Sequence, residues 1–170
     1  LYIPFLALKM ERFQLARDKA LSHFNAANHM LTVTYPLLND PKLLLGVIDS
    51  IFLAITNTMA AILWYDRLFK EIPPFHDNFD SKFNMFQAKC APKYKIQKET
   101  IKLIQDIKEL IVIHRKSPME FRRKGKFIIS DEGYHLKALT ASEIKEYLKK
   151  TKSFVAAMTD IVSKHERIFG

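Results

Sequence analysis

The chemistry that this sequence most clearly allows is phosphate binding by a cluster of basic side chains. Six Lys and Arg residues lie close together: Arg115, Lys116, Arg122, Arg123, Lys124 and Lys126. Glu120 is the only acidic residue among them. Arg pairs with phosphate through two parallel hydrogen bonds, and Lys attracts it as a point charge. We therefore take these residues, called the basic segment, as the candidate nucleic-acid-binding site.

The stretch that contains the basic segment also accounts for most of the net charge of the chain. Residues 91–130 hold 11 Lys and Arg against 4 Asp and Glu, a net charge of +7, and the whole chain holds 27 against 18, a net charge of +9. A focused positive field favours a polyanionic partner. We expect that partner to be RNA or a ribonucleoprotein. The simpler alternative is an ordinary solvated surface, with Arg115 and Lys116 compensating the dipole at a helix C-terminus.

Other chemistry has weaker signals. No two of the six histidines have the i, i+4 spacing of a helical zinc site, and the chain has no phosphate-binding glycine loop and no Gly-x-Ser-x-Gly motif. The sequence therefore predicts no metal, no cofactor and no catalytic residue. Asp49, Asp66 and Asp160 lie in mostly apolar stretches, where two carboxylates that met could act as acid and base. The favoured interpretation is that each one caps a helix, pairs with Lys or Arg, or lies at the surface.

Cys90 is the single cysteine, so no internal disulfide can form. We expect it to be buried beside phenylalanine residues. The absence of a disulfide framework indicates an intracellular, cytoplasmic protein.

Proline positions and apolar spacing divide the chain into helices. Long helices are predicted over residues 5–35, 40–71, 97–116 and 140–168, with a short one over 78–90. Asp40 before Pro41, and Thr140 three residues before Glu143, are helix start signals. Residues 126–130 and 134–138 alternate as two strands around Gly133. The predicted fold is a single all-α domain, residues 1–170: a four-helix bundle of long antiparallel helices, with a short extra helix and a small β-hairpin before the last helix.

Residues 43–65 raise a membrane alternative. Asp49 is their only charged residue, and the stretch is long enough to span a bilayer. Asp49 and the polar residues 56–58 interrupt it, and an intramembrane Asp is costly. A buried core helix is the favoured interpretation, and we expect no contact with a membrane.

The order of long helices, basic turn and capped final helix resembles the HEPN superfamily of RNA-associated helical bundles. Arg123 matches the arginine of the family motif, and Ser130 and Asp131 match its polar tail, while Ile129 stands at the histidine position. A second match, Arg17 to His23, falls in the middle of the first helix and is interpreted as chance. Residues 117–124 are also similar to a stretch of uncharacterised archaeal proteins, which implies no function.

The resemblance implies a bundle that binds RNA without cleaving it, because isoleucine cannot transfer a proton. It leaves two alternatives open. One is a degenerate metal-independent ribonuclease that uses Arg123 with His114 or His135. The other is a protein-interaction subunit that forms a homodimer through a helix face and binds no nucleic acid.

Overall fold

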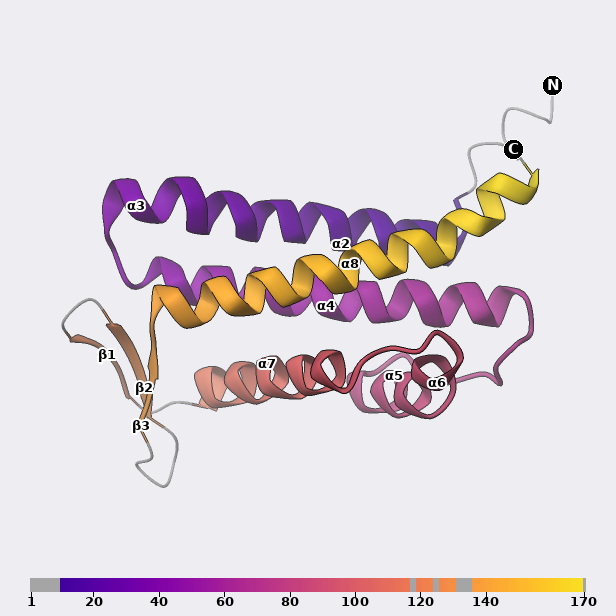
Figure 1. The fold of residues 1–170 in the computed structure, drawn as a ribbon. Coiled ribbons are helices and arrows are strands. Elements are labelled where there is room, and N and C mark those ends of the chain that lie inside the picture. The colour runs from indigo at the N-terminus through magenta and orange to yellow at the C-terminus, as the bar shows by residue number, and fades with distance from the viewer. Residues whose placement is uncertain (1–9, 117–118, 124–125, 131–135, 170) are drawn as a thin grey trace.

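The computed structural model describes residues 10–116, 119–123, 126–130 and 136–169, with side chains placed for residues 10–115 and 138–164. These residues are predominantly helical, which confirms the predicted all-α class (Figure 1). The helices are α2 (Arg12–His29), α3 (Tyr35–Leu38), α4 (Leu43–Leu68), α5 (Phe79–Met85), α6 (Ala91–Lys93), α7 (Lys98–Lys116) and α8 (Ala141–Phe169). Two π-helical segments, η1 (Met30–Thr34) and η2 (Phe86–Cys90), join α2 to α3 and α5 to α6.

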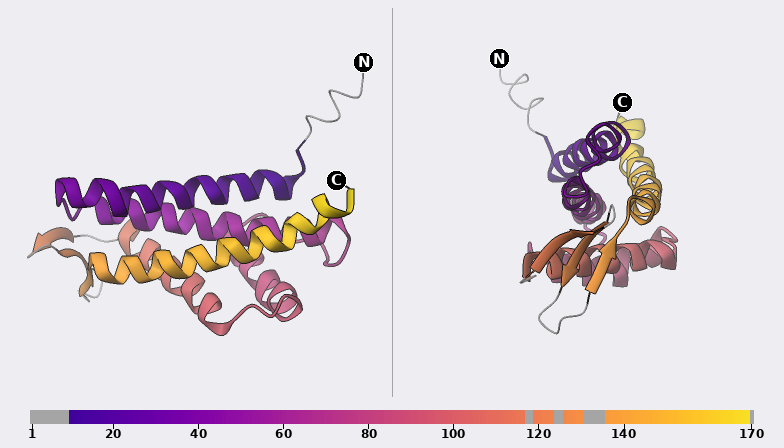
Figure 2. Two further views of the ribbon diagram at one scale, coloured as in Figure 1. Left: turned by 45° about the horizontal axis from the view of Figure 1, so that its top comes forward. Right: turned by 90° about the vertical axis from the view of Figure 1, so that its left-hand side faces the viewer.

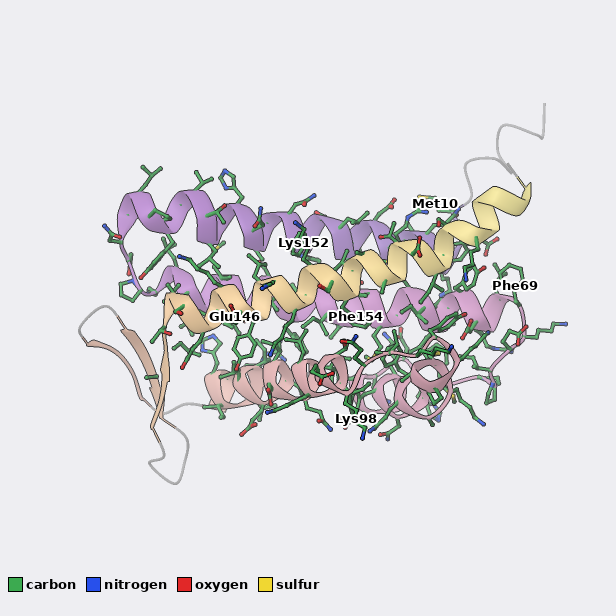
Figure 3. The ribbon with its side chains drawn as sticks, in the orientation of Figure 1. Met10, Phe69, Lys98, Glu146, Lys152 and Phe154 are labelled. Carbon is green, nitrogen blue, oxygen red and sulfur yellow. The ribbon has the colours of Figure 1, made fainter. Side chains whose placement is uncertain are left out.

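Helix α4 lies at the centre of the molecule. Helix α2 packs along it, α8 crosses both of them, and α7 packs against α4 and α8 (Figure 2). Each surrounding helix turns a buried apolar stripe inward, as the spacing predicts: Phe13, Ala16, Ala20 and Ala27 of α2; Ile104, Ile107, Leu110 and Ile111 of α7; Ile144, Leu148, Val155, Met158 and Val162 of α8. Phe154 of α8 meets the ring of Phe86 in η2 edge-to-face, with centroids 5.7 Å apart (Figure 3).

Pro36 does not end the first long helix, contrary to the prediction. The residue before it, Tyr35, donates its backbone N–H to the carbonyl of Met30, five residues back, and the chain stays helical to Leu38. Ala91 before Pro92 bonds to Phe86 in the same way. A proline ring clashes with the carbonyl four residues back in a regular α-helix. In both places the proline follows directly on a wider π turn, so the helix continues through a proline that would otherwise stop it.

Helix boundaries follow the predicted caps closely. Thr140 Oγ1 accepts the backbone N–H of Glu143 at 3.2 Å directly before α8, and Asp40 Oδ1 accepts that of Lys42 at 3.0 Å, although α4 begins at Leu43 rather than at Pro41. Two other ends differ from the prediction. Helix α4 stops at Leu68 because Lys70 takes a left-handed conformation with φ 56°. Helix α2 starts at Arg12, where Glu11 forms a capping box with Gln14, so residues 10 and 11 of the predicted helix are not helical, while residues 1–9 lie outside the described part.

Three short strands lie beyond the end of α7: β1 (Met119–Arg123), β2 (Lys126–Ser130) and β3 (Leu136–Leu139). They form an antiparallel sheet in the order β1-β2-β3. The segment that the sequence predicts as a basic turn therefore contains strand β1. Charged residues lower strand propensity, and pairing with the Ile-rich β2 overrides it. Charged residues are also typical of an edge strand such as β1.

Removal of the Thr140 cap provides a test of the start of α8. We expect Thr140→Ala to lower the free energy of unfolding by about 1 kcal/mol, because the hydroxyl that accepts the Glu143 N–H is lost. Urea unfolding followed by circular dichroism measures this. Thr140→Ser keeps the acceptor and should unfold like the original chain, and equal stability of the Ala variant would contradict the assigned cap.

Candidate nucleic-acid interface

The basic segment begins at the C-terminal end of α7. Arg115 is exposed, and its guanidinium carbon lies 5.8 Å from the ring centroid of Phe52 on α4. About two helical turns earlier on α7, Lys108 Nζ lies 4.4 Å from the ring centroid of Phe79. A cation over an aromatic face within about 6 Å is attracted by the ring quadrupole. Arg115 is thus partly fixed against the body of the protein, with its helix end next to the sheet.

The remaining residues of the basic segment lie on two neighbouring strands. Arg122 and Arg123 belong to β1, and Lys126 begins β2. The register places Arg122 opposite Phe127 and Arg123 opposite Lys126. Lys116 is the last residue of α7, and Lys124 lies outside the described residues. Since paired strands are about 4.8 Å apart, the antiparallel pairing brings basic residues from β1 and β2 together at one end of the molecule.

The catalytic alternative cannot be built from the described side chains. His114 lies half-buried near the end of α7, while His135 and the side chain of Arg123 lie outside the described part. The pairing of Arg123 with either histidine stays a prediction. In the other motif match, Arg17 Nε binds Asp18 Oδ1 at 3.2 Å on the regular helix α2, six residues before His23. A separation of six residues places the side chains of Arg17 and His23 about 120° apart around the helix.

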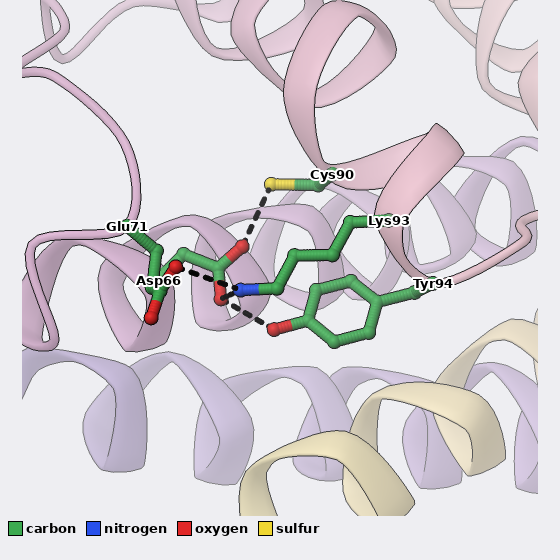
Figure 4. A network of polar contacts seen from close by, with 5 residues as sticks. All are labelled: Asp66, Glu71, Cys90, Lys93 and Tyr94. Atoms are coloured by element: carbon green, nitrogen blue, oxygen red, sulfur yellow. Dashed lines mark hydrogen bonds and ion pairs between the residues drawn. The ribbon is translucent and has the colours of Figure 1, made fainter.

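A buried polar cluster lies towards the other end of α4, and the sequence located only its central residue. Asp66 is fully buried there (Figure 4). Its Oδ1 accepts hydrogen bonds from Lys93 Nζ at 3.2 Å and from the Tyr94 hydroxyl, and its Oδ2 accepts the Cys90 thiol at 3.4 Å. Lys93 Nζ also lies 3.8 Å from Glu71 Oε2. The favoured expectation that Asp66 pairs with Lys or Arg is confirmed.

The cluster keeps the Cys90 thiol and the Tyr94 hydroxyl in their protonated, neutral forms. Burial, helped by the negative charge of Asp66, raises the pKa of the Cys90 thiol well above its ordinary value. Burial and the hydrogen bond to Asp66 raise the pKa of the Tyr94 hydroxyl in the same direction. A thiol that stays protonated is a poor nucleophile. The arrangement therefore serves to hold η2 and α6 against α4.

Two other predicted acids lie apart from this cluster. Asp160 is exposed on α8, as the favoured interpretation expects, and Asp49 is half-buried on α4. Cys90 is buried, as expected, but its contact with Asp66 was not predicted. The only signal for that contact was a carboxylate in an apolar helix. Its donors lie 24 to 28 residues away, so local spacing could not identify them.

Helix α4 is also the one described helix whose length and composition would allow a membrane span. Its most apolar window is 56% buried inside the protein. A core helix of a water-soluble protein passes the same test, so the finding is weak evidence for a span.

The comparisons with known proteins identify no family for this chain. None of the protein families, curated proteins or solved structures compared with this chain matches it. Among the described residues, no three His, Cys, Asp or Glu side chains are grouped so that they could hold a metal ion. What the site can do must therefore be argued from its own residues.

Replacing Asp66 tests the structural role of the cluster. We expect Asp66→Ala to lower the free energy of unfolding by about 3 kcal/mol, because three donors lose their acceptor in the interior. Asp18→Ala is the matched control, since that carboxylate pairs with Arg17 at the surface and should contribute less than about 1 kcal/mol. Equal losses in urea unfolding of the two variants would contradict the role.

The raised pKa values predict a loss of stability in alkali. The ordinary pKa values of the Cys90 thiol and the Tyr94 hydroxyl are 9.0 and 10.0, and both are higher in the folded protein. Below about pH 9 both groups are protonated whether the chain is folded or not, so their contribution is complete. Above that pH the unfolded chain loses these protons first, and the free energy of unfolding should fall.

Urea unfolding at a series of alkaline pH values measures this fall. Tyr94→Phe removes one of the two groups, so its free energy of unfolding should fall less steeply with pH than that of the original chain. Parallel curves would show that Tyr94 does not contribute.

Proposed function

We propose that this protein binds RNA or an RNA-containing assembly through the basic segment, residues 115–126, without acting as an enzyme. The observation that carries the proposal is the concentration of charge: residues 115–126 hold six Lys and Arg against Glu120, a net charge of +5 out of +9 for the whole chain. Phosphate contacts by Lys and Arg provide most of the affinity in sequence-independent nucleic-acid binding. Because the rest of the chain carries a lower density of net charge, the positive field directs such a ligand towards this one region.

The arrangement of the backbone supports the proposal. Helix α7 delivers Arg115 and Lys116 at its end, and β1 and β2 follow directly with Arg122, Arg123 and Lys126. The antiparallel register sets Arg123 opposite Lys126. Basic residues are therefore gathered on adjoining elements at one end of the molecule (Figure 1). Arg favours bidentate contacts to phosphate and can stack on unpaired bases.

We also propose the finer architecture that the sequence favours: a four-helix bundle of α2, α4, α7 and α8 with a hairpin before α8. The packing of these four helices around α4 and the antiparallel pairing of β2 with β3 support it. The HEPN resemblance, the homodimer, the cytoplasmic location and the absence of membrane contact stay predictions. Cleavage of mixed RNA by the purified protein, lost in Arg123→Ala, would favour the ribonuclease alternative instead.

The salt dependence of RNA binding tests the proposed function. Arg122→Ala, Arg123→Ala and Lys124→Ala combined should weaken binding and flatten the slope of log affinity against log salt by about 2 to 3, since each lost phosphate contact removes about 0.7 to 0.9. Fluorescence anisotropy with a labelled RNA over a range of KCl concentrations measures both quantities.

A control variant that loses the same number of positive charges elsewhere distinguishes RNA binding at a local site from attraction of RNA by the overall charge of the protein. Three exposed lysines lie away from the sheet: Lys89 on η2, Lys95 between α6 and α7, and Lys98 at the start of α7. Replacing all three with Ala gives the distal variant, which loses the same charge. It should keep most of the affinity and of the slope. Equal weakening in both variants, or no binding by the original chain, would refute the proposal.

A further inference from the structure

Helix α8 carries three exposed lysines on one side of its first half: Lys145, Lys149 and Lys152. Their spacings of four and three residues place them within about 60° of one another around the helix, at 3.6 residues per turn. Along the axis they span about 10 Å at 1.5 Å per residue. Glu143 and Glu146 offset only part of the charge of the same stretch, which also contains Lys150.

The helical arrangement separates Glu143 from the three lysines, and Glu146 borders only Lys149. Glu143 lies about 120° or more around the helix from each of the three lysines, whereas Glu146 lies about 60° from Lys149 and about 100° or more from Lys145 and Lys152. Glu143 faces Tyr147, whose pKa is raised first by burial and then by the charges of Asp106, Glu143 and Glu109. Acidic groups of α7 and α8 thus gather around Tyr147, on the side of α8 that the stripe does not occupy. Figure 3 labels Lys152 and Glu146 on α8.

The α2 surface beside Lys152 does not neutralise the stripe. Lys152 borders a hollow of about 380 Å³ between α8 and α2, where the α2 residues are the uncharged Leu21, Phe24 and Asn25. Residues 19–39 of the chain, which include the second half of α2, contain no Asp or Glu. Asp160, which also borders the hollow, lies eight residues beyond Lys152, about 12 Å along the axis, and marks the end of the stripe.

The stripe starts at the same end of the molecule as the basic segment. Helix α8 begins at Ala141, directly after β3, and β3 pairs with β2, the strand that Lys126 begins. Figures 1 and 2 show the sheet at the end of the molecule where α8 begins. The two sets of cations therefore lie on adjoining elements, although 19 residues separate Lys126 from Lys145 in the chain.

We propose that the outer side of α8 is a phosphate-binding track, formed by Lys145, Lys149 and Lys152, along which RNA held by the basic segment continues. This inference rests on the proposed function and adds the path of the ligand. A span of about 10 Å corresponds to about three phosphates along one strand, at about 3.4 Å each. Lysines bind phosphates as point charges and do not read bases. The track therefore adds affinity without sequence preference.

The test replaces all three lysines with Ala in the full chain, giving the track variant. Ala favours helix, so the variant should keep its fold, which circular dichroism checks. Anisotropy titrations with a labelled single-stranded RNA, and with the same RNA as a duplex, are repeated over a range of KCl concentrations. We expect at least a tenfold loss of affinity in low salt for one or both RNA forms, and a slope reduced by about 2 to 3.

The distal variant is the matched control, because it loses the same charge from another part of the surface. The original chain and the distal variant should bind alike, and the track variant should bind more weakly. If the track variant binds both RNA forms as the distal variant does, the track is refuted while the proposed function stands. If the original chain binds neither form, both the proposed function and the track are refuted.

Discussion

The enclosure of helix α4 is the constraint on which the rest of the structure depends. Fifteen of its 26 residues are buried, and they cover most of its circumference. Apolar surface left in water would cost about 0.8 kcal/mol for each methylene group. One partner helix cannot cover such a surface, so α2, α7 and α8 each supply an apolar stripe. Their positions around α4 in turn decide where the sheet and the exposed cations lie.

Asp66 adds a directional contact to this otherwise apolar core. Apolar packing tolerates small shifts, whereas a buried carboxylate requires donors at defined positions. Cys90, Lys93 and Tyr94 come from η2, from α6 and from the residue after α6, and they converge on the two oxygens. Helix α7 starts four residues after Tyr94, at Lys98. The cluster therefore fixes the point from which α7 runs towards the sheet.

Charge is distributed unevenly over this framework. The basic segment follows the C-terminal end of α7, where the helix dipole is negative, so Arg115 and Lys116 lie in a favourable field. Beyond that end the strands carry further cations that the dipole does not explain. On α8, Lys145, Lys149 and Lys152 share one side, whereas Glu143 and Lys150 lie on another. A net charge counted along the chain hides this separation, whereas a phosphate backbone would encounter only one side.

Local signals in the sequence were sufficient for most of the helices. Apolar periodicity identified the buried stripes of α7 and α8, the cap at Thr140 falls where it was expected, and Asp40 lies in the turn before α4. Such signals act within one or two helical turns, so they can be read without the fold. The prediction that the first long helix ends before Pro36 was wrong, because the effect of this proline depends on the π turn before it.

What the sequence by itself determined is therefore the helical class, the stripes and the concentration of charge in residues 91–130. Only the tertiary structure decided the partners of Asp66, the pairing of β1 with β2, and the side of α8 that carries its lysines outward. Each of these joins segments distant in the chain. Their contacts depend on how whole helices pack around α4, and no local spacing contains that information.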